Sequence, residues 1–323
     1  MRDFLKRQWL LLGLLAAVGL SFLIPAWGAS GGYLHSEVTT KIGIVLIFFF
    51  QGWMLPTEVL TKSLLRWKAH LFTQVFIFGV FPLIVIGGDL LWGPYISEPL
   101  RVGFFFLAVL PTTISSAIVF TSQAKGSTAV SLFNTTIANV AGVILTPLWM
   151  ALLVQTNMGE MDSFGAVVIK LSKLIILPLV IGQIAHVLSK GLLDRIRPYI
   201  GHFSQLVIVF IVFAAFSNSV KGGAWDGQSP MLVFVTILIC LFVFLVITIV
   251  CLYVLHLLQF DQSDRAAIFF CGTQKTLATG IPLGVSLLGN DPAFGIILLP
   301  LMIYHPIQLL FGAVFIHRFQ KYS

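Results

Sequence analysis

The residues most able to bind a solute or an ion lie in the middle of an apolar stretch from Arg265 to Leu288. The stretch is long enough to cross a bilayer, for which about 20 apolar residues suffice. Its centre nevertheless holds a lysine among small and polar residues, namely Gly272, Thr273, Gln274, Lys275, Thr276, Thr279, Gly280 and Pro282. A lysine at membrane depth costs at least about 2.5–3.5 kcal/mol, so such a cluster indicates broken backbone that is buried in protein or lines a cavity.

Two interpretations of Lys275 stay open at this point. In the first, its ammonium binds an anion, displaces a coupling cation or carries a proton, because an ionisable residue inside a membrane is a candidate functional group. In the second, it pairs with backbone carbonyls and holds two half-helices together. The neighbouring side chains of Thr273, Gln274 and Thr276 either supply ligands to a bound solute or join helices, as polar groups often do in membranes.

A second stretch, from Arg101 to Ala124, carries a polar interruption at the matching position. Aligned without gaps, Arg101 falls on Arg265 and Thr112 falls on Thr276. The interruption consists of Pro111, Thr112, Thr113, Ser115 and Ser116. Discontinuous helices at equivalent places in two halves are typical of transporters with inverted repeats. We therefore expect breaks at Pro111 and at Gly280 and Pro282 to form one solute site.

Further polar residues could face these breaks. Ser131, Asn134, Thr135 and Asn139 recur at near-helical spacing and predict a polar stripe on one helix. His305 interrupts the last apolar segment and could titrate, or could be a packed histidine with a satisfied nitrogen. Hydroxyl groups in membrane helices often bond back to their own helix, which is the alternative for the serine and threonine residues.

The composition indicates an all-α polytopic membrane protein. Of 323 residues, 58% are hydrophobic and only 10% are charged, and the apolar runs exceed the length of barrel strands. The three cysteines lie in apolar segments, so no disulfide framework is expected. The net charge of +7 lies on loops rather than on a basic domain. The expected partners are membrane lipid and a small organic solute, not nucleic acid.

The apolar segments predict ten spans within a single transporter domain that covers 1–323. Their approximate bounds are 8–27, 39–56, 69–92, 102–124, 127–155, 165–189, 202–220, 230–258, 265–288 and 293–318. Ten spans divide into two five-helix repeats of opposite orientation, 8–156 and 165–318. With a cytoplasmic N-terminus, thirteen lysines and arginines fall on the cytoplasmic side and five on the other. This bias predicts that both termini are cytoplasmic, and the short loops suggest a bacterial inner membrane.

The motifs of membrane and soluble enzymes that we sought are missing from the sequence. It contains no His-Glu-x-x-His, no Gly-x-Ser-x-Gly and no phosphate-binding P-loop. No cluster of acidic residues within the spans could act as an acid/base pair. We therefore expect neither enzymatic activity nor a cofactor.

Three segments carry a resemblance to a known family, namely Phe50–Glu58, Cys271–Pro282 and Leu299–Gln308. They closely resemble the SBF-like branch of the bile acid:sodium symporter superfamily, solute carrier family 10, and within it the subgroup of the vertebrate seventh member. The resemblance runs over essentially the whole chain. It implies a core domain with crossing, discontinuous spans 4 and 9, a panel domain of spans 1, 2, 6 and 7, and alternating access.

Only some of the family's sodium-binding positions are retained in this sequence. The retained positions, which are candidate Na⁺ ligands, are Ser116, Ser131, Thr135 and Gln274. Ala117 and Lys275 stand where the family has asparagines, and Phe270 stands where it has a glutamate. The family's glutamate carboxylate, which is missing here, would offset the charge of a bound Na⁺. Lys275 instead adds a positive charge that repels Na⁺. We therefore predict that Lys275 substitutes electrostatically for sodium or exchanges a proton, so the coupling ion is Na⁺ or H⁺.

The resulting expectation is a secondary active transporter of a small organic solute. The N-termini of the half-helices and Lys275 would make a central cavity positive, which favours an anion. The alternative is a membrane regulator or scaffold that has kept the fold and lost transport. Saturable solute flux would distinguish the two.

Overall fold

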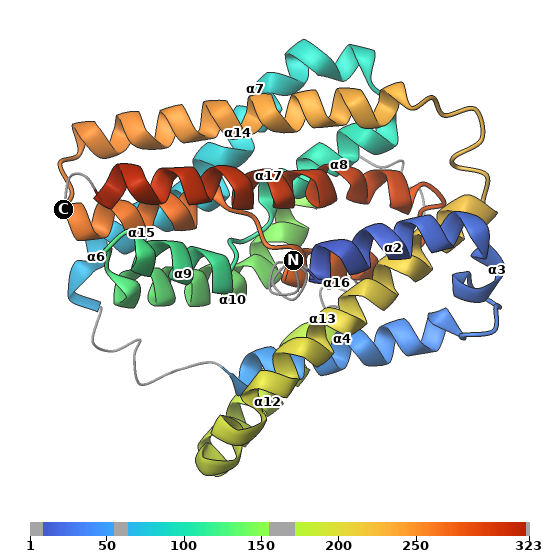
Figure 1. Cartoon of the computed structure of the whole chain (residues 1–323), viewed down its shortest axis with the longest axis horizontal. Coiled ribbons are helices and arrows are strands. Elements are labelled where there is room, and N and C mark those ends of the chain that lie inside the picture. The colour runs from blue at the N-terminus through green and yellow to red at the C-terminus, as the bar shows by residue number, and fades with distance from the viewer. Residues whose placement is uncertain (1–8, 55–63, 155–171, 321–323) are drawn as a thin grey trace. The chain divides into compact units, whose positions relative to one another are not determined.

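The computed structural model describes residues 9–54, 64–154 and 172–320, and every regular element within these ranges is a helix (Figure 1). Parts of three predictions lie outside the described residues. These are Leu55–Glu58 of the family motif, the ends of the first repeat at 8 and at 155–156, and the start of the second repeat at 165–171. The chain forms two compact units, and each is described by itself.

Unit 1 contains 1–55, 155–228 and 281–296. Its helices are α2 (Trp9–Leu23), α3 (Pro25–Gly28), α4 (Ser36–Trp53), the π-helical turn η4 (Ser172–Ile176), α12 (Leu177–Leu188) and α13 (Lys190–Lys221). Helix α12 packs along α4, and α13 packs against α2, α3 and α4. These helices correspond to the predicted spans 1, 2, 6 and 7.

The backbones of α4 and α12 approach each other very closely at two glycines. A Cβ atom added to Gly52 would lie 2.0 Å from the carbonyl oxygen of Leu179, and one added to Gly182 would lie 2.0 Å from that of Phe49. Small residues at helix contacts permit this approach in membrane proteins, where packing rather than a hydrophobic driving force holds helices together. The two glycines therefore set the spacing of α4 and α12.

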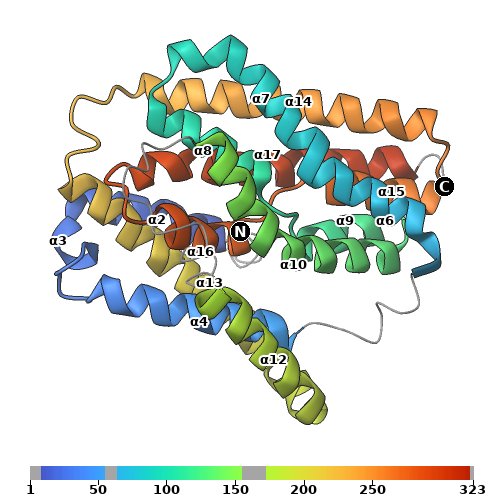
Figure 2. The same cartoon turned by 180° about the vertical axis from the view of Figure 1, so that it is seen from behind.

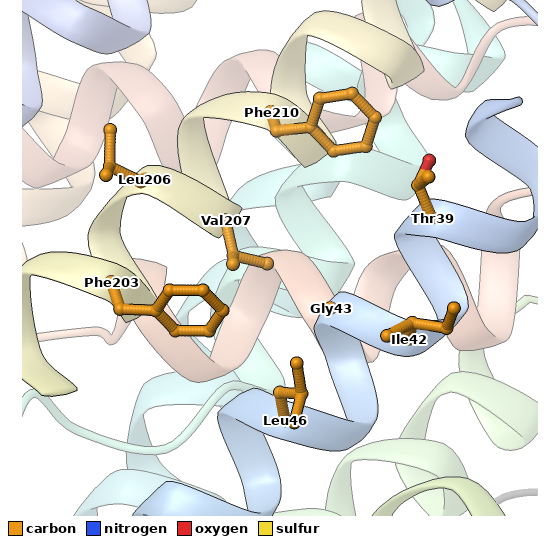
Figure 3. Close-up of a pocket in the computed structure, with 8 residues that line it drawn as sticks. All are labelled: Thr39, Ile42, Gly43, Leu46, Phe203, Leu206, Val207 and Phe210. Atoms are coloured by element: carbon orange, nitrogen blue, oxygen red, sulfur yellow. The ribbon is translucent and has the colours of Figure 1, made fainter. Parts of the chain in front are cut away.

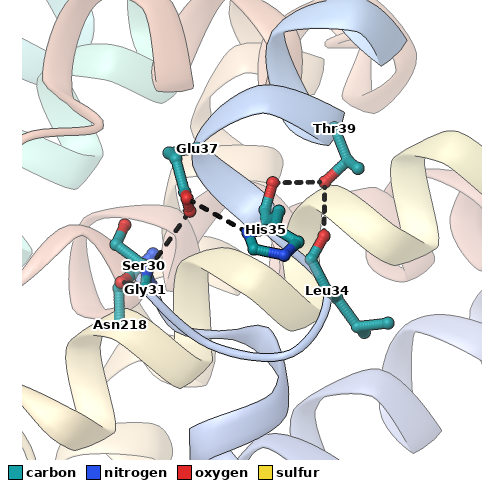
Figure 4. Close-up of polar contacts among 7 residues, drawn as sticks. All are labelled: Ser30, Gly31, Leu34, His35, Glu37, Thr39 and Asn218. Atoms are coloured by element: carbon teal, nitrogen blue, oxygen red, sulfur yellow. Dashed lines mark hydrogen bonds and ion pairs between the residues drawn. The ribbon is translucent and has the colours of Figure 1, made fainter.

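The loop between α3 and α4 is fastened to α13 by polar contacts (Figure 4). The amide of Ser30 donates to Oδ1 of Asn218 at 2.8 Å, and the amide of Gly31 donates to Glu37 at 3.3 Å. His35 adopts a left-handed conformation with φ of 44° and lies 3.7 Å from Glu37. These contacts fix the entry of the chain into α4.

Unit 2 contains 56–154, 229–280 and 297–323. Its elements include α6 (Trp67–Val75), the π-helical turn η2 (Phe76–Val80), α7 (Phe81–Trp92), α8 (Glu98–Val109), α9 (Ser115–Gln123), α10 (Thr128–Leu153), α14 (Met231–Leu257) and α15 (Gln262–Thr273). Helix α16 (Leu277–Leu288) belongs to unit 2 up to Gly280, and α17 (Phe294–Gln320) belongs to it from Ile297. Short 3₁₀ turns cover Leu64–Arg66 and Gly93–Tyr95.

Helix α10 touches α6, α8, α9 and α15, so it lies at the centre of unit 2; its place beside α6 is clear from behind (Figure 2). Helices α14 and α17 run alongside each other (Figure 1). The ring of Phe244 on α14 lies 6.0 Å from that of Tyr304 and 5.4 Å from that of Phe311, centroid to centroid. This packing holds Tyr304 and its neighbours on α17 against the rest of the unit.

Five helical segments are long and apolar enough to cross a membrane by length and composition, namely Trp67–Tyr95, Thr128–Leu153, Tyr199–Lys221, Met231–Leu257 and Phe294–Gln320. Shorter apolar helices include Trp9–Leu23. Many large apolar side chains on these helices are exposed, as Leu83 and Leu310 are, which suits contact with lipid. The chain is thus an integral membrane protein, whereas the ten spans, the inverted repeat and the orientation stay predictions.

An ion pair closes the turn between α7 and α8. Arg101 makes a bidentate contact with the buried carboxylate of Asp89, with Nε at 2.7 and 2.8 Å from the two oxygens. We expect Asp89→Asn to lower the free energy of unfolding by about 1–2 kcal/mol, because charge-assisted hydrogen bonds are lost while Arg101 is half exposed. Unfolding in mixed micelles would measure this. Arg101→Lys should cost nearly as much, since lysine lacks the planar fork, and equal stability of all three proteins would contradict the argument.

Candidate functional site

The helix break predicted at Pro111 is present, and it meets a second break at Gln274 within unit 2. The prediction that Gly280 and Pro282 break the helix is wrong, because both lie inside α16, and glycine and proline are tolerated within membrane helices. Helix α8 ends at Val109 because Pro111 forces Leu110 out of the helical conformation, to ψ of 150°. Helix α15 ends at Thr273, and Gln274 is extended at φ −97°, ψ 149°. The amide of Thr276 donates to the carbonyl oxygen of Pro111 at 2.9 Å, which joins the two breaks directly.

The end of α8 would leave several buried carbonyl groups without helical partners. Every carbonyl from Leu107 to Thr112 nevertheless accepts a hydrogen bond at 2.7–3.4 Å. In chain order, the donors are the amide of Leu110, Lys275 Nζ, the hydroxyl of Thr146, Lys275 Nζ again, the amide of Thr276 and the amide nitrogen of Asn139. These carbonyl groups are thus satisfied by donors of the protein, as a membrane interior requires.

Lys275 donates two of these hydrogen bonds, more than any other residue. Its side chain is fully buried, and Nζ donates to the carbonyl oxygens of Ala108 at 2.7 Å, Leu110 at 2.8 Å and Ile77 at 3.0 Å. Nζ also lies 4.0 Å from the centre of the Phe81 ring, a distance typical of a cation–π contact. An ammonium group has three donors, and all three are used. These are the contacts that the second interpretation of Lys275 expects, and none is left for an anion in this arrangement.

The carbonyl of Ile77 is available to accept a hydrogen bond from Lys275 because a proline lies one turn later. In the π-helical turn η2 the amide of Phe81 donates to Phe76, five residues back. In this register the carbonyl of Ile77 faces the nitrogen of Pro82, which carries no hydrogen. Ile77 and Phe81 were not among the predicted site residues. Pro82 within an apolar span was the signal that could have indicated a free carbonyl.

The backbone of Lys275 is held by a residue on α17. The amide of Lys275 donates to Oε1 of Gln308 at 2.7 Å, and Nε2 of Gln308 donates back to the carbonyl of Lys275 at 2.9 Å. Gln308 is fully buried, and its Nε2 also lies 3.0 Å from Nδ1 of His305. The hydroxyl of Tyr304 donates to the carbonyl of Thr273 at 2.9 Å. His305 is therefore next to the break, and Gln308 bonds to both backbone groups of Lys275.

Gln274 lies in a polar cluster on the other side of the break. Its Oε1 accepts hydrogen bonds from the hydroxyls of Thr113 at 2.5 Å and Ser116 at 2.7 Å, and these hydroxyls lie 2.6 Å apart. Gln274 is only 1% exposed, yet its Nε2 has no hydrogen-bond partner among the described residues. The hydroxyl of Thr112 is also buried without a partner there. A solute oxygen could therefore accept a hydrogen bond from Gln274.

Thr276 caps the start of α16, and a hydrogen bond between Thr279 and Asn139 joins α16 to α10. Thr276 precedes α16, and its hydroxyl accepts from the amide of Thr279 at 3.3 Å, as an N-cap does. The hydroxyl of Thr279 donates to Oδ1 of Asn139 at 2.7 Å, while Nδ2 of Asn139 donates to Thr112. A Cβ atom on Gly280 would lie 2.7 Å from Leu110, so this glycine permits close packing of the two breaks. Pro282 lies further along, inside α16.

The remaining predicted site residues have other contacts. Ser115 is exposed at the start of α9. Thr273 and Thr135 bond to carbonyls of their own helices, at Phe269 and Leu132. Oγ of Ser131 lies 3.4 Å from Sγ of Cys271. The side chain of Asn134 bonds to the carbonyl of Val130 and to the side chain of Gln74. Of the four candidate Na⁺ ligands, Ser116 and Gln274 are thus joined, whereas Ser131 and Thr135 bond elsewhere.

A groove in unit 1 differs from this site in character. It has a volume of about 310 Å³ and lies between α4 and α13 (Figure 3). Its lining consists of Thr39, Ile42, Gly43, Leu46, Phe203, Leu206, Val207 and Phe210, so it is almost entirely apolar. In the described part of the chain, no group of three or more His, Cys, Asp or Glu side chains could hold a metal ion. The polar groups that could bind a solute therefore lie at the breaks in unit 2.

Comparison with known proteins supplies the family. The model of the SBF-like CPA transporter family matches residues 8–321. The chain is 31% identical to Sodium/bile acid cotransporter 7 of Rattus norvegicus over 321 residues, which covers 96% of this chain and 92% of the rat protein. It is 29% identical to the protein of the same name in Danio rerio, with coverage of 96% and 92%. Together with two broken helices that meet at a buried lysine, these matches establish that the chain belongs to the SBF-like CPA transporter family.

Proposed function

We propose that this chain is a secondary active transporter that moves a small organic anion by alternating access, with the solute bound where the two helix breaks meet. The observation that carries the proposal is the buried Nε2 of Gln274, which has no hydrogen-bond partner in the described part of the chain. Such an atom is costly unless a ligand or water satisfies it in some state of the protein. An N–H donor at a helix break is also the kind of group that orients a solute carboxylate.

The charges around the breaks favour an anion. Helices α9 and α16 begin beside the breaks, and the N-terminus of a helix carries a partial positive charge. Lys275 adds a full positive charge that the described carbonyl contacts do not neutralise. The names of the rat and zebrafish relatives mention bile acids and sodium. We extend to this chain only the class of organic anions, and we infer that sodium coupling is replaced either by Lys275 or by proton exchange.

The experiment is solute flux into proteoliposomes that contain the purified protein. Taurocholate and a panel of smaller mono- and dicarboxylates are first screened by their effect on the melting temperature, since a ligand of the folded state raises it. Uptake of labelled hits is then measured with and without gradients of Na⁺ and H⁺. Saturable uptake supports the proposal. Anion binding without flux would favour the alternative, a non-transporting regulator or scaffold, and inhibition by organic cations alone would contradict the substrate class.

Gln274→Leu is expected to reduce uptake of the transported anion by about 10- to 100-fold, because a hydrogen bond to a charged group contributes about 1.5–3 kcal/mol. Gln228→Leu is the matched control, since Gln228 is exposed in the loop before α14. The melting temperature of both variants is measured alongside. Unchanged uptake by a well-folded Gln274→Leu protein would show that the amide does not bind the solute.

A further inference from the structure

We infer that the carbonyl oxygens of Ile77, Ala108 and Leu110 form a binding site for a monovalent cation, and that the ammonium of Lys275 is its permanent, tethered occupant. The inference deepens the proposed function, because it assigns to the chain itself the positive charge that a coupling ion would otherwise bring. Of the two roles left open for Lys275, it favours the electrostatic replacement of sodium, since an ammonium held by three carbonyls supplies the charge of a bound ion.

The site is built by prolines that remove the normal partners of its oxygens. Pro82 has no hydrogen to offer Ile77, and Pro111 ends α8 so that Ala108 and Leu110 have no helical donors. Each of the three oxygens points at one atom, Nζ, from 2.7–3.0 Å. Convergent backbone carbonyls replace the hydration shell of a cation in ion-conducting membrane proteins, and here three carbonyls converge on the ammonium.

The geometry fits the protonated amine. Three acceptors surround Nζ, and an ammonium group supplies three N–H donors. A neutral amine has only two N–H groups, so its lone pair would face one of the carbonyl oxygens. The ring of Phe81, 4.0 Å from Nζ, adds an electrostatic attraction that exists only for the cation. The three carbonyl oxygens and the Phe81 ring therefore all favour the protonated form of Lys275.

The occupant also joins parts of the chain that lie far apart in sequence. Nζ connects the turn η2 and the end of α8, while Gln308 on α17 holds the backbone of the same lysine from both sides. The positive charge is consequently fixed beside Gln274, the next residue in the chain. A solute anion at Gln274 would feel this charge without contacting the ammonium directly.

The test is chemical rescue of the full-length protein in detergent. Lys275→Ala should lower the melting temperature by at least about 5 °C, because three buried carbonyls lose their donor. n-Propylammonium supplies the atoms that this substitution removes. We expect it to restore at least half of the loss in a saturable manner, whereas 1-propanol and choline should not.

The wild type and Lys275→Met are the controls, because the lysine or the methionine side chain fills the space; neither should respond to n-propylammonium. Equal responses of all three proteins, or a Lys275→Ala protein as stable as the wild type, would overturn the inference. If the alanine variant folds only when cells are grown with n-propylammonium, that supports it. Failure to fold under either condition counts against it.

A second variant checks the origin of the site. Pro82→Ala offers the carbonyl of Ile77 an amide hydrogen, so Lys275→Ala should lower the melting temperature less in this background than in the wild type. An equal loss would show that Pro82 does not create the site. These melting measurements need no solute flux, so a protein that transports nothing would defeat the proposed function and leave the cation site standing.

Discussion

Gly182→Ala is expected to lower the free energy of unfolding by about 3 kcal/mol or more, a large effect for one methyl group. The added carbon would lie 2.0 Å from the carbonyl oxygen of Phe49, 2.8 Å from the amide of Trp53 and 2.9 Å from the carbonyl carbon of Phe49. Overpacking usually costs about 1–3 kcal/mol where side chains can adjust. Here the obstacle is backbone, so α4 and α12 must separate. Unfolding in mixed micelles would measure the loss.

Gly52→Ala should have a similar effect, since its added carbon would lie 2.0 Å from the carbonyl oxygen of Leu179 on the opposite helix. Gly201→Ala is the matched control, because nothing lies within 4 Å of that position in α13. It should stabilise the protein slightly, by about 0.5–1 kcal/mol, as alanine does within a helix. If all three variants were equally stable, the close crossing of α4 and α12 would be refuted.

The breaks at Pro111 and beside Lys275 could be predicted from the sequence because their causes are local, whereas Gly280 and Pro282 do not interrupt α16 as predicted. Pro111 excludes the helical conformation at Leu110, and a lysine beside small and polar residues does not occur in an uninterrupted apolar helix. The interpretation of Lys275 as a partner of carbonyls was also within reach, because an ammonium buried in a membrane protein must find acceptors. In each case the residue type alone implies the local structure or the partner that it needs.

The partners of these residues could not be predicted, because they depend on tertiary packing. Ile77 accepts a hydrogen bond only because η2 shifts the helical register ahead of Pro82. Ser131 and Thr135 matched the hydroxyl ligands of the family, but Thr135 bonds to its own helix and Ser131 contacts Cys271. A hydroxyl satisfied within its helix looks the same in sequence as one that binds an ion.

Gln308 illustrates the same limit, and its replacement by methionine is expected to lower the free energy of unfolding by about 3–5 kcal/mol. Methionine fills a similar volume but removes the two hydrogen bonds to the backbone of Lys275 and the contact with His305. The amide of Lys275 would then lose its partner and the carbonyl of Lys275 would lose the bond from Gln308, at about 1–3 kcal/mol each. The loss is measured by unfolding in mixed micelles.

Gln320→Met is the control on the same helix, because Gln320 makes one exposed hydrogen bond, to Gln123, and its loss should cost no more than about 0.5 kcal/mol. The expected difference between the two variants follows from burial and from the two backbone hydrogen bonds that only Gln308 makes. If Gln308→Met were as stable as Gln320→Met, the extended backbone at Lys275 would not depend on α17. Lys275 would then be held by its side chain, and the carbonyls of Ile77, Ala108 and Leu110 would have to fix the break unaided.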